Sequence, residues 1–172
     1  MAANREWILS HEGPGTRVTV WAHNGHVTRS SDGWFESMGS DLAKALGSRY
    51  AAIGQFFHRG ELRAWDIREK DREKLSVLPI DVGPAPKGSV GDALNRIGLE
   101  HPFLSLSARS GRLAKRWIET PHLVREVSAL YSGEEEQGNL TSLPSNFDAI
   151  VFLRTVTATE AKPTGLRGPN SR

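Results

Sequence analysis

Two histidines, His23 and His26, stand on either side of an Asn-Gly pair in the stretch WAHNGHV. If residues 23–26 form a β-turn, the end Cα atoms lie within about 7 Å, so both imidazoles can point into one small volume. Histidine exchanges protons near neutral pH, so such a pair can activate a water molecule or protonate a leaving group. Asn-Gly is also the strongest short-range signal for a β-hairpin. The stretch therefore predicts either a proton-transfer site or a hairpin that two histidines merely flank.

Other kinds of chemistry find less support in the sequence. Two histidines supply only two metal ligands, and no nearby carboxylate is spaced to complete the set, so we expect no metal and no other cofactor. The chain has no cysteine, which excludes disulfides, thiolate nucleophiles and cysteine-based zinc sites. It has no G-x-S-x-G nucleophile elbow, no P-loop and no dinucleotide-binding fingerprint. Hydrolysis through a serine elbow and nucleotide binding are therefore not predicted.

The remaining four histidines are weaker candidates. His58 is predicted at the end of a strand, beside Arg59-Gly60, and a surface position is the simpler interpretation. The others stand alone and are expected at the surface or at helix caps: His11, His101 and His122.

The elements that must position the histidine pair alternate between helices and strands. Apolar spacing predicts helices over residues 2–12, 38–46, 89–97 and 112–118, and strands over 17–21, 50–57, 61–66, 75–82, 103–107 and 147–153. The helix after Ser89 has the best local evidence, because Ser89 can cap it with Asp92 at the third position and Gly98 can end it. This alternation predicts an α/β domain with a mostly parallel or mixed sheet and flanking helices. Ligands of such sheets bind beyond the carboxyl ends of strands, and the histidine pair follows the predicted strand 17–21.

Composition points to one globular domain. The chain has 172 residues, of which 38% are hydrophobic and 24% charged, and its 22 basic and 20 acidic side chains are interspersed. No basic stripe marks a nucleic-acid surface, no window approaches the ~18 apolar residues of a membrane span, and no signal peptide is visible. We therefore expect a cytoplasmic protein without a nucleic-acid or membrane partner. Residues 158–172 have nothing to bury and predict a disordered tail.

Several motifs, taken in order along the chain, resemble the erythromycin esterase family. WAHNGHV is the most specific, and the others support it in series: Met1-Ala2-Ala3-Asn4, Met38-Gly39 with Leu42, Tyr50 with Ile53-Gly54, Phe57 and Gly60, Ser89-Val90, and Phe147-Asp148-Ala149-Ile150. The resemblance implies that residues 1–157 form the C-terminal portion of an esterase-like domain, an incomplete part of a larger fold. It also favours a catalytic strand-to-helix loop over a hairpin at residues 23–26.

The resemblance implies a reaction as well. Members of the family hydrolyse the lactone ester of macrolide antibiotics without a metal, which confers resistance, and a histidine general base activates the water. His23 and His26 would be catalytic here. The residues that would contact the small-molecule ester or macrolide are Trp21, Asn24, Gly25 and His58.

Departures from the family pattern qualify this expectation. Family members are about twice as long, and the half that carries the principal general base, its partner glutamates and an Arg-Asp pair has no counterpart here. We therefore expect a truncated or split esterase that is inactive alone and that associates, through exposed apolar faces, with the missing N-terminal half or with itself. The alternative is a non-catalytic remnant or a module that binds a small molecule or a partner chain.

Overall fold

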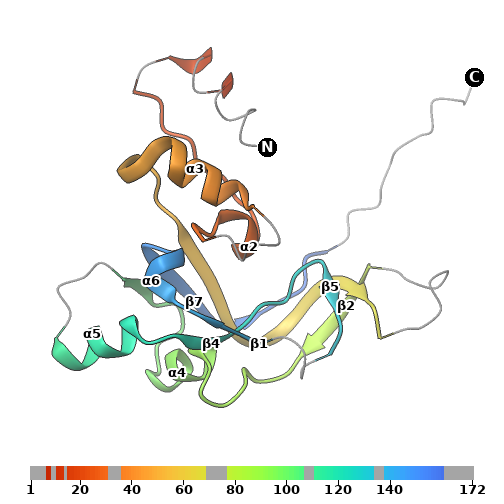
Figure 1. Ribbon diagram of the computed structural model, residues 1–172. Helices are drawn as coiled ribbons and strands as arrows, with labels where there is room; N and C mark the ends of the chain where they lie inside the picture. The colour runs from red at the N-terminus through yellow and green to blue at the C-terminus, as the bar shows by residue number, and fades with distance from the viewer. Residues whose placement is uncertain are drawn as a thin grey trace, which may run out of the picture.

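The computed structural model describes residues 7–8, 11–13, 15–30, 36–68, 77–106, 111–133 and 138–160. Figure 1 shows the elements that these residues form. The helices are α2 (Asn24–Val27), α3 (Met38–Leu46), α4 (Val90–Arg96), α5 (Arg112–Glu119) and α6 (Leu143–Asn146), with a 3₁₀ turn at Gly47–Arg49. The strands are β1 (Ile53–Asp66), β2 (Val77–Val82), β3 (Phe103–Ser105), β4 (His122–Arg125), β5 (Leu130–Tyr131), β6 (Gly138–Thr141) and β7 (Ala149–Val156).

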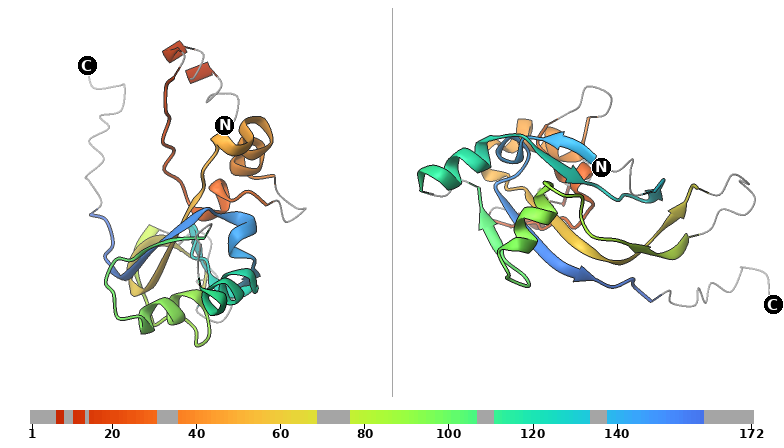
Figure 2. Two further views of the ribbon diagram at one scale, coloured as in Figure 1. Left: turned by 90° about the vertical axis from the view of Figure 1, so that its left-hand side faces the viewer. Right: turned by 90° about the horizontal axis from the view of Figure 1, so that it is seen from below.

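The main sheet is mixed, which confirms the predicted α/β class. Its order is β2-β1-β7-β3, and β5 also pairs with β1. β7 and β5 run parallel to β1, whereas β2 pairs antiparallel with β1 and β3 antiparallel with β7. β4 and β6 form a separate antiparallel pair. Helices flank this sheet, and α4 and α5 lie below it in the left view of Figure 2.

The hydrophobic core lies around β1 and β7. One cluster joins Phe56 of β1 and Phe152 of β7 to Val90 and Leu94 of α4, and a smaller cluster lies under the β1–β2–β5 end of the sheet. The capped helix α4 thus reaches the core as its sequence predicted: the Ser89 hydroxyl accepts from the Asp92 amide at 3.3 Å. No helix of the described residues is long and apolar enough to cross a membrane. The cytoplasmic location stays a prediction.

The strands predicted at 50–57 and 61–66 are one continuous strand, β1, so the predicted break between them is wrong. Gly60 pairs with Val156 of β7 on one side and Val82 of β2 on the other. A Cβ at Gly60 would lie 2.0 Å from the Val156 carbonyl oxygen, and the φ angle of Gly60 is +129°. Glycine is therefore required here for the close approach of two strands.

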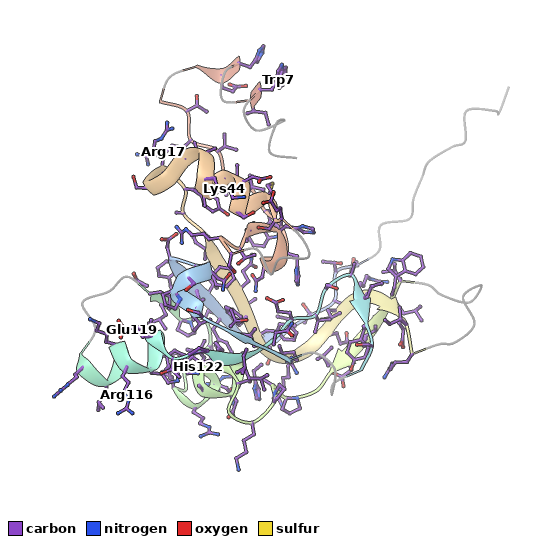
Figure 3. All side chains as sticks on the ribbon, in the orientation of Figure 1. Trp7, Arg17, Lys44, Arg116, Glu119 and His122 are labelled. Carbon is purple, nitrogen blue, oxygen red and sulfur yellow. The ribbon has the colours of Figure 1, made fainter. Side chains whose placement is uncertain are left out.

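The strand predicted at residues 17–21 is also wrong. All five residues are exposed, and within the described part of the chain no backbone hydrogen bond involves residues 17–22. Strand propensity needs a neighbouring strand to be realised, and no described strand pairs with this segment. Figure 2 (left) shows the segment running from α2 away from the sheet, and Figure 3 places Trp7 and Arg17 in this part of the molecule.

The other boundaries follow the predictions in part. The helices predicted at 38–46, 89–97 and 112–118 are confirmed, and the strand predicted from residue 147 begins at Ala149. The short elements β4, β5, β6 and α6 were not predicted. Residues 7–8 and 11–12 are helical, whereas the rest of the predicted helix 2–12 lies outside the described residues, as do residues 75–76, residue 107 and most of the predicted tail.

Candidate functional site

Residues 23–28, here called the histidine turn, form one turn of helix and no hairpin. His23 is the N-cap of α2, and its backbone carbonyl accepts from the His26 amide at 2.8 Å. Gly25 is helical, and no described non-glycine residue has a positive φ. The β-hairpin alternative that Asn-Gly suggested is therefore wrong. The loop alternative is closer, because an extended segment here leads directly into a helix (Figure 2, left).

The ring of His23 uses both of its nitrogens. Nδ1 accepts a hydrogen bond from the Gly25 amide at 3.2 Å, and Nε2 lies 3.0 Å from the Val127 carbonyl oxygen. Because Nδ1 accepts, the proton of the neutral ring is on Nε2, which donates to Val127. His26 follows three residues later, in the last turn of α2, and both histidines are exposed.

Asn24 fixes the start of the turn to the central strand. Its side-chain Nδ2 donates to the carbonyl oxygen of Gln55 in β1 at 2.8 Å, and its Oδ1 accepts from the Gln55 amide at 2.8 Å. The residue is only 7% exposed. Its predicted contact with substrate is not tested, but in this structure the amide is engaged by the strand.

An ion pair fixes the end of the turn to β1 and β7. The guanidinium of Arg29 pairs with Asp148 and also donates to the carbonyl oxygen of Tyr50 at 3.0 Å. Asp148 also accepts from the Ala52 amide at 2.7 Å, immediately before β1. Burial raises the pKa of the Tyr50 phenol, which stays protonated and donates to the carbonyl oxygen of Val27. Sequence reasoning missed this pair, although Asp148 is the one polar residue in the apolar run 147–153.

A second set of polar contacts holds the same end. The hydroxyl groups of Thr28 and Ser30 both donate to the side-chain oxygen of Asn146, which ends α6. The Asn146 amide donates in turn to the carbonyl oxygen of Ser142 at 2.9 Å. The histidine turn is therefore anchored at both ends.

Helix α3 packs directly against the turn through Gly39. A Cβ on Gly39 would lie 2.3 Å from the Val27 carbonyl oxygen and 2.5 Å from that of Thr28. We expect Gly39→Ala to separate α3 from the turn and to lower the free energy of unfolding by about 3 kcal/mol, because the obstructing atoms are backbone. Urea unfolding measures this. Ala45→Val, which adds carbon on the exposed side of α3, is the control, and an equal loss in both variants would contradict the packing argument.

The remaining predicted contact residues, Trp21, Gly25 and His58, lie in three different environments. Trp21 is 84% exposed. Gly25 donates its amide to His23, and His122 donates to the Trp117 carbonyl oxygen at the end of α5, as a capping histidine does. His58 lies within β1 and is half-buried, so its predicted surface position is wrong, because β1 continues past it. Its Nδ1 is buried and has no hydrogen-bond partner among the described residues.

Burial, followed by the positive charges of Arg125, Arg59 and Arg154, lowers the pKa of His58 below the ordinary histidine value, and Asp92 partly opposes this. The unfolded chain then binds more protons than the folded one between the folded pKa and about 6.5, so stability falls as the pH falls through that window. We expect the free energy of unfolding, measured by urea titration, to fall less between pH 7.5 and pH 5 in His58→Gln than in the wild type. Parallel pH profiles would contradict this.

Groups of at least three His, Cys, Asp or Glu residues that could hold a metal ion do not occur among the described residues. An apolar hollow of about 220 Å³ lies over β1 and β7, and its lining includes Gln55, the residue to which Asn24 is bonded, together with Phe57 and Leu153.

Comparisons with known proteins place this chain in a family. The family model described as erythromycin esterase matches residues 1–156. The chain is 24% identical over 165 residues to the Bacillus subtilis (strain 168) protein named "Putative hydrolase YbfO", covering 91% of this chain and 34% of that protein.

Solved structures agree on the fold. A succinoglycan biosynthesis protein superposes with a TM-score of 0.72 at 21% identity, over 91% of this chain and 37% of that one. A mutant of the erythromycin esterase EreC in its open conformation superposes with a TM-score of 0.58 at 18% identity, over 90% of this chain and 35% of that one. The chain spans about a third of the length of these relatives, so the expected twofold difference in length was too small. The family model covers nearly the whole chain, and the chain therefore belongs to the erythromycin esterase family.

Proposed function

We propose that this chain is the C-terminal part of an ester hydrolase in which His23 and His26 handle protons during hydrolysis of a macrolide lactone or a related small ester. The observation that carries the proposal is that two exposed histidines, the N-cap of α2 and a residue within it, belong to one short turn that is anchored at both ends. A positioned imidazole that transfers a proton typically contributes about 10²–10⁴ in rate. Fixed geometry is what such a contribution requires.

The tautomer of His23 suggests one task in the reaction. Nε2–H donates to the Val127 carbonyl oxygen, so a substrate oxygen in the place of that carbonyl would receive the same hydrogen bond. A donor directed at the developing oxyanion stabilises the tetrahedral intermediate. Either histidine, once protonated, can deliver a proton to the departing alkoxide.

The proposal includes a need for further polypeptide. The exposed segment 17–21 has strand propensity without a strand partner, and it leads directly into the histidine turn. We propose that in the longer relatives this segment pairs with polypeptide outside the matched third, which completes the site, and that the chain alone gives no turnover.

In the absence of that polypeptide we expect the chain to pair with a second copy of itself. Antiparallel pairing about Thr19 would place Arg17 opposite Trp21 and Val18 opposite Val20, a self-complementary arrangement. A contact this small is weak, so association should appear only at high protein concentration in analytical ultracentrifugation. Val20→Lys should abolish it, whereas the control Leu140→Lys, at another exposed apolar residue, should not. Association that only Leu140→Lys removes would contradict this pairing.

Incubating the purified chain with a 14-membered macrolide and following lactone opening by mass spectrometry tests the proposal. We expect no opening above the buffer rate. Opening by the chain alone that is lost in His23→Ala would support the hydrolase and refute the need for completion.

One observation favours a second candidate, a module that binds a small molecule without turnover. Both ring nitrogens of His23 are hydrogen-bonded within the chain, so in this state the ring has no lone pair for a water molecule. Macrolide binding measured by calorimetry, with unchanged lactone under every condition, would establish this candidate instead.

A further inference from the structure

We propose that Asn24 is the positioning residue of the histidine turn, and that its side-chain amide occupies the free edge of β1 as a neighbouring strand would. The inference rests on the proposed function, because the position of the turn matters for catalysis only if the two histidines handle protons.

The edge of β1 is unpaired by any described strand at this point. β7 pairs along one side of β1, with Gln55 opposite Val151. β2 pairs with β1 only from Gly60 to Trp65, and β5 only at Trp65 and Asp66. The backbone N–H and C=O of Gln55 both bond to Asn24, so they point to the free side. An adjacent strand would offer one donor and one acceptor there, and the Asn24 amide offers the same two groups at 2.8 Å each.

The place of Asn24 in the sequence makes this pairing decisive for the histidines. It is the first residue of α2, immediately after His23 and two residues before His26. Its backbone carbonyl accepts from the Thr28 amide at 2.9 Å, which closes the turn. A shift of Asn24 along the strand edge would therefore move both imidazoles together.

Direct contact of Asn24 with substrate is the competing role. The Asn24 side chain is buried, and its oxygen and nitrogen are both committed to one backbone residue. A ligand that used this amide would leave the N–H and C=O of Gln55, a half-buried residue, without their two hydrogen bonds, which costs stability. The contacts therefore favour positioning.

The proposal is tested by comparing Asn24→Ala with Asn24→Asp. Alanine removes both hydrogen bonds. An ionised aspartate keeps one acceptor but turns a second oxygen towards the Gln55 carbonyl, whereas a protonated aspartic acid again offers one donor and one acceptor. Burial at this site and the facing Gln55 carbonyl oxygen raise the pKa of the introduced carboxyl group above the ordinary aspartate value, so mild acid should restore the pairing in Asn24→Asp alone. Asn139→Asp, at an exposed site on β6, is the matched control.

Two NMR measurements report the result. At pH 7.5 we expect the Gln55 amide to exchange about tenfold faster or more in both Asn24 variants, and the His23 ring ¹⁵N shifts to leave the Nε2–H pattern, while the core amide of Phe152 stays protected. At pH 4.5 the protection factor of Gln55 in Asn24→Asp should return to the wild-type value at that pH, and that in Asn24→Ala should not.

Unchanged Gln55 exchange and unchanged His23 shifts in Asn24→Ala would overturn the proposal. So would an Asn24→Asp variant that remains as perturbed as Asn24→Ala at pH 4.5. Neither measurement needs ester turnover, so failure of this role and failure of the hydrolase proposal give different results.

Discussion

Replacing Gly60 with valine is expected to unfold the chain. Gly60 lies where β1 pairs with β7 on one side and β2 on the other, and any Cβ would overlap the Val156 carbonyl oxygen at 2.0 Å and approach the Val156 nitrogen at 2.7 Å. These obstructing atoms belong to the strand backbone and cannot rotate away. The φ angle of +129° is, in addition, one that side chains other than glycine rarely adopt.

The expected loss exceeds about 4 kcal/mol, a large part of the total stability of a typical domain. Circular dichroism during thermal unfolding measures it. Gly111→Ala is the matched control, because a Cβ there has nothing within 4 Å. A Gly60→Val variant that unfolds cooperatively at the wild-type temperature would show that β1 and β7 do not approach as described.

The second large effect concerns the histidines in a complete protein. We expect ester hydrolysis by the erythromycin esterase EreC, with its matched third replaced by this chain, to depend on His23 and His26. Replacing either with alanine should lower kcat/KM by about 10²–10⁴, the usual contribution of a proton-transfer group. Hydrolysis of a chromogenic ester measures this directly.

His122→Ala is the control for general loss of histidine, because this ring contacts Trp117 at the end of α5, donating to its carbonyl oxygen and packing against its indole ring. If all three substitutions lowered kcat/KM by the same small factor, the histidine turn would take no part in hydrolysis. The loss should appear mainly in kcat if the rings act in the transition state and mainly in KM if they only bind the ester.

The sequence predicted the elements whose signals are local. Helix α4 carries its own cap at Ser89 and its stop at Gly98, and both lie where predicted. The short strands β4 to β6 could not be predicted, because two to four residues become a strand only through their neighbours. Residues 17–21 are the opposite case. They have strand propensity, but no described strand pairs with them, and the segment stays unpaired.

The candidate site was predicted only in part, because its conformation depends on residues that are distant in the sequence. His23 and His26 follow from the sequence, but the helical form of the turn depends on contacts with distant residues. Asn24 bonds to Gln55, and Arg29 pairs with Asp148 more than a hundred residues away. The Asn-Gly dipeptide alone favours a hairpin. The contacts with these distant residues select the helical turn instead.

The central claim is that the histidine turn belongs to a hydrolytic site that further polypeptide completes. Its most direct test uses the relative whose matched third is replaced by this chain, here called the joined protein. Lactone opening by the chain alone is compared with lactone opening by the joined protein at equal concentration, after cooperative folding of both has been verified. We predict opening by the joined protein, lost in His23→Ala, and none by the chain alone. A folded joined protein that leaves the lactone intact, or a lone chain that opens it equally fast, would contradict the claim.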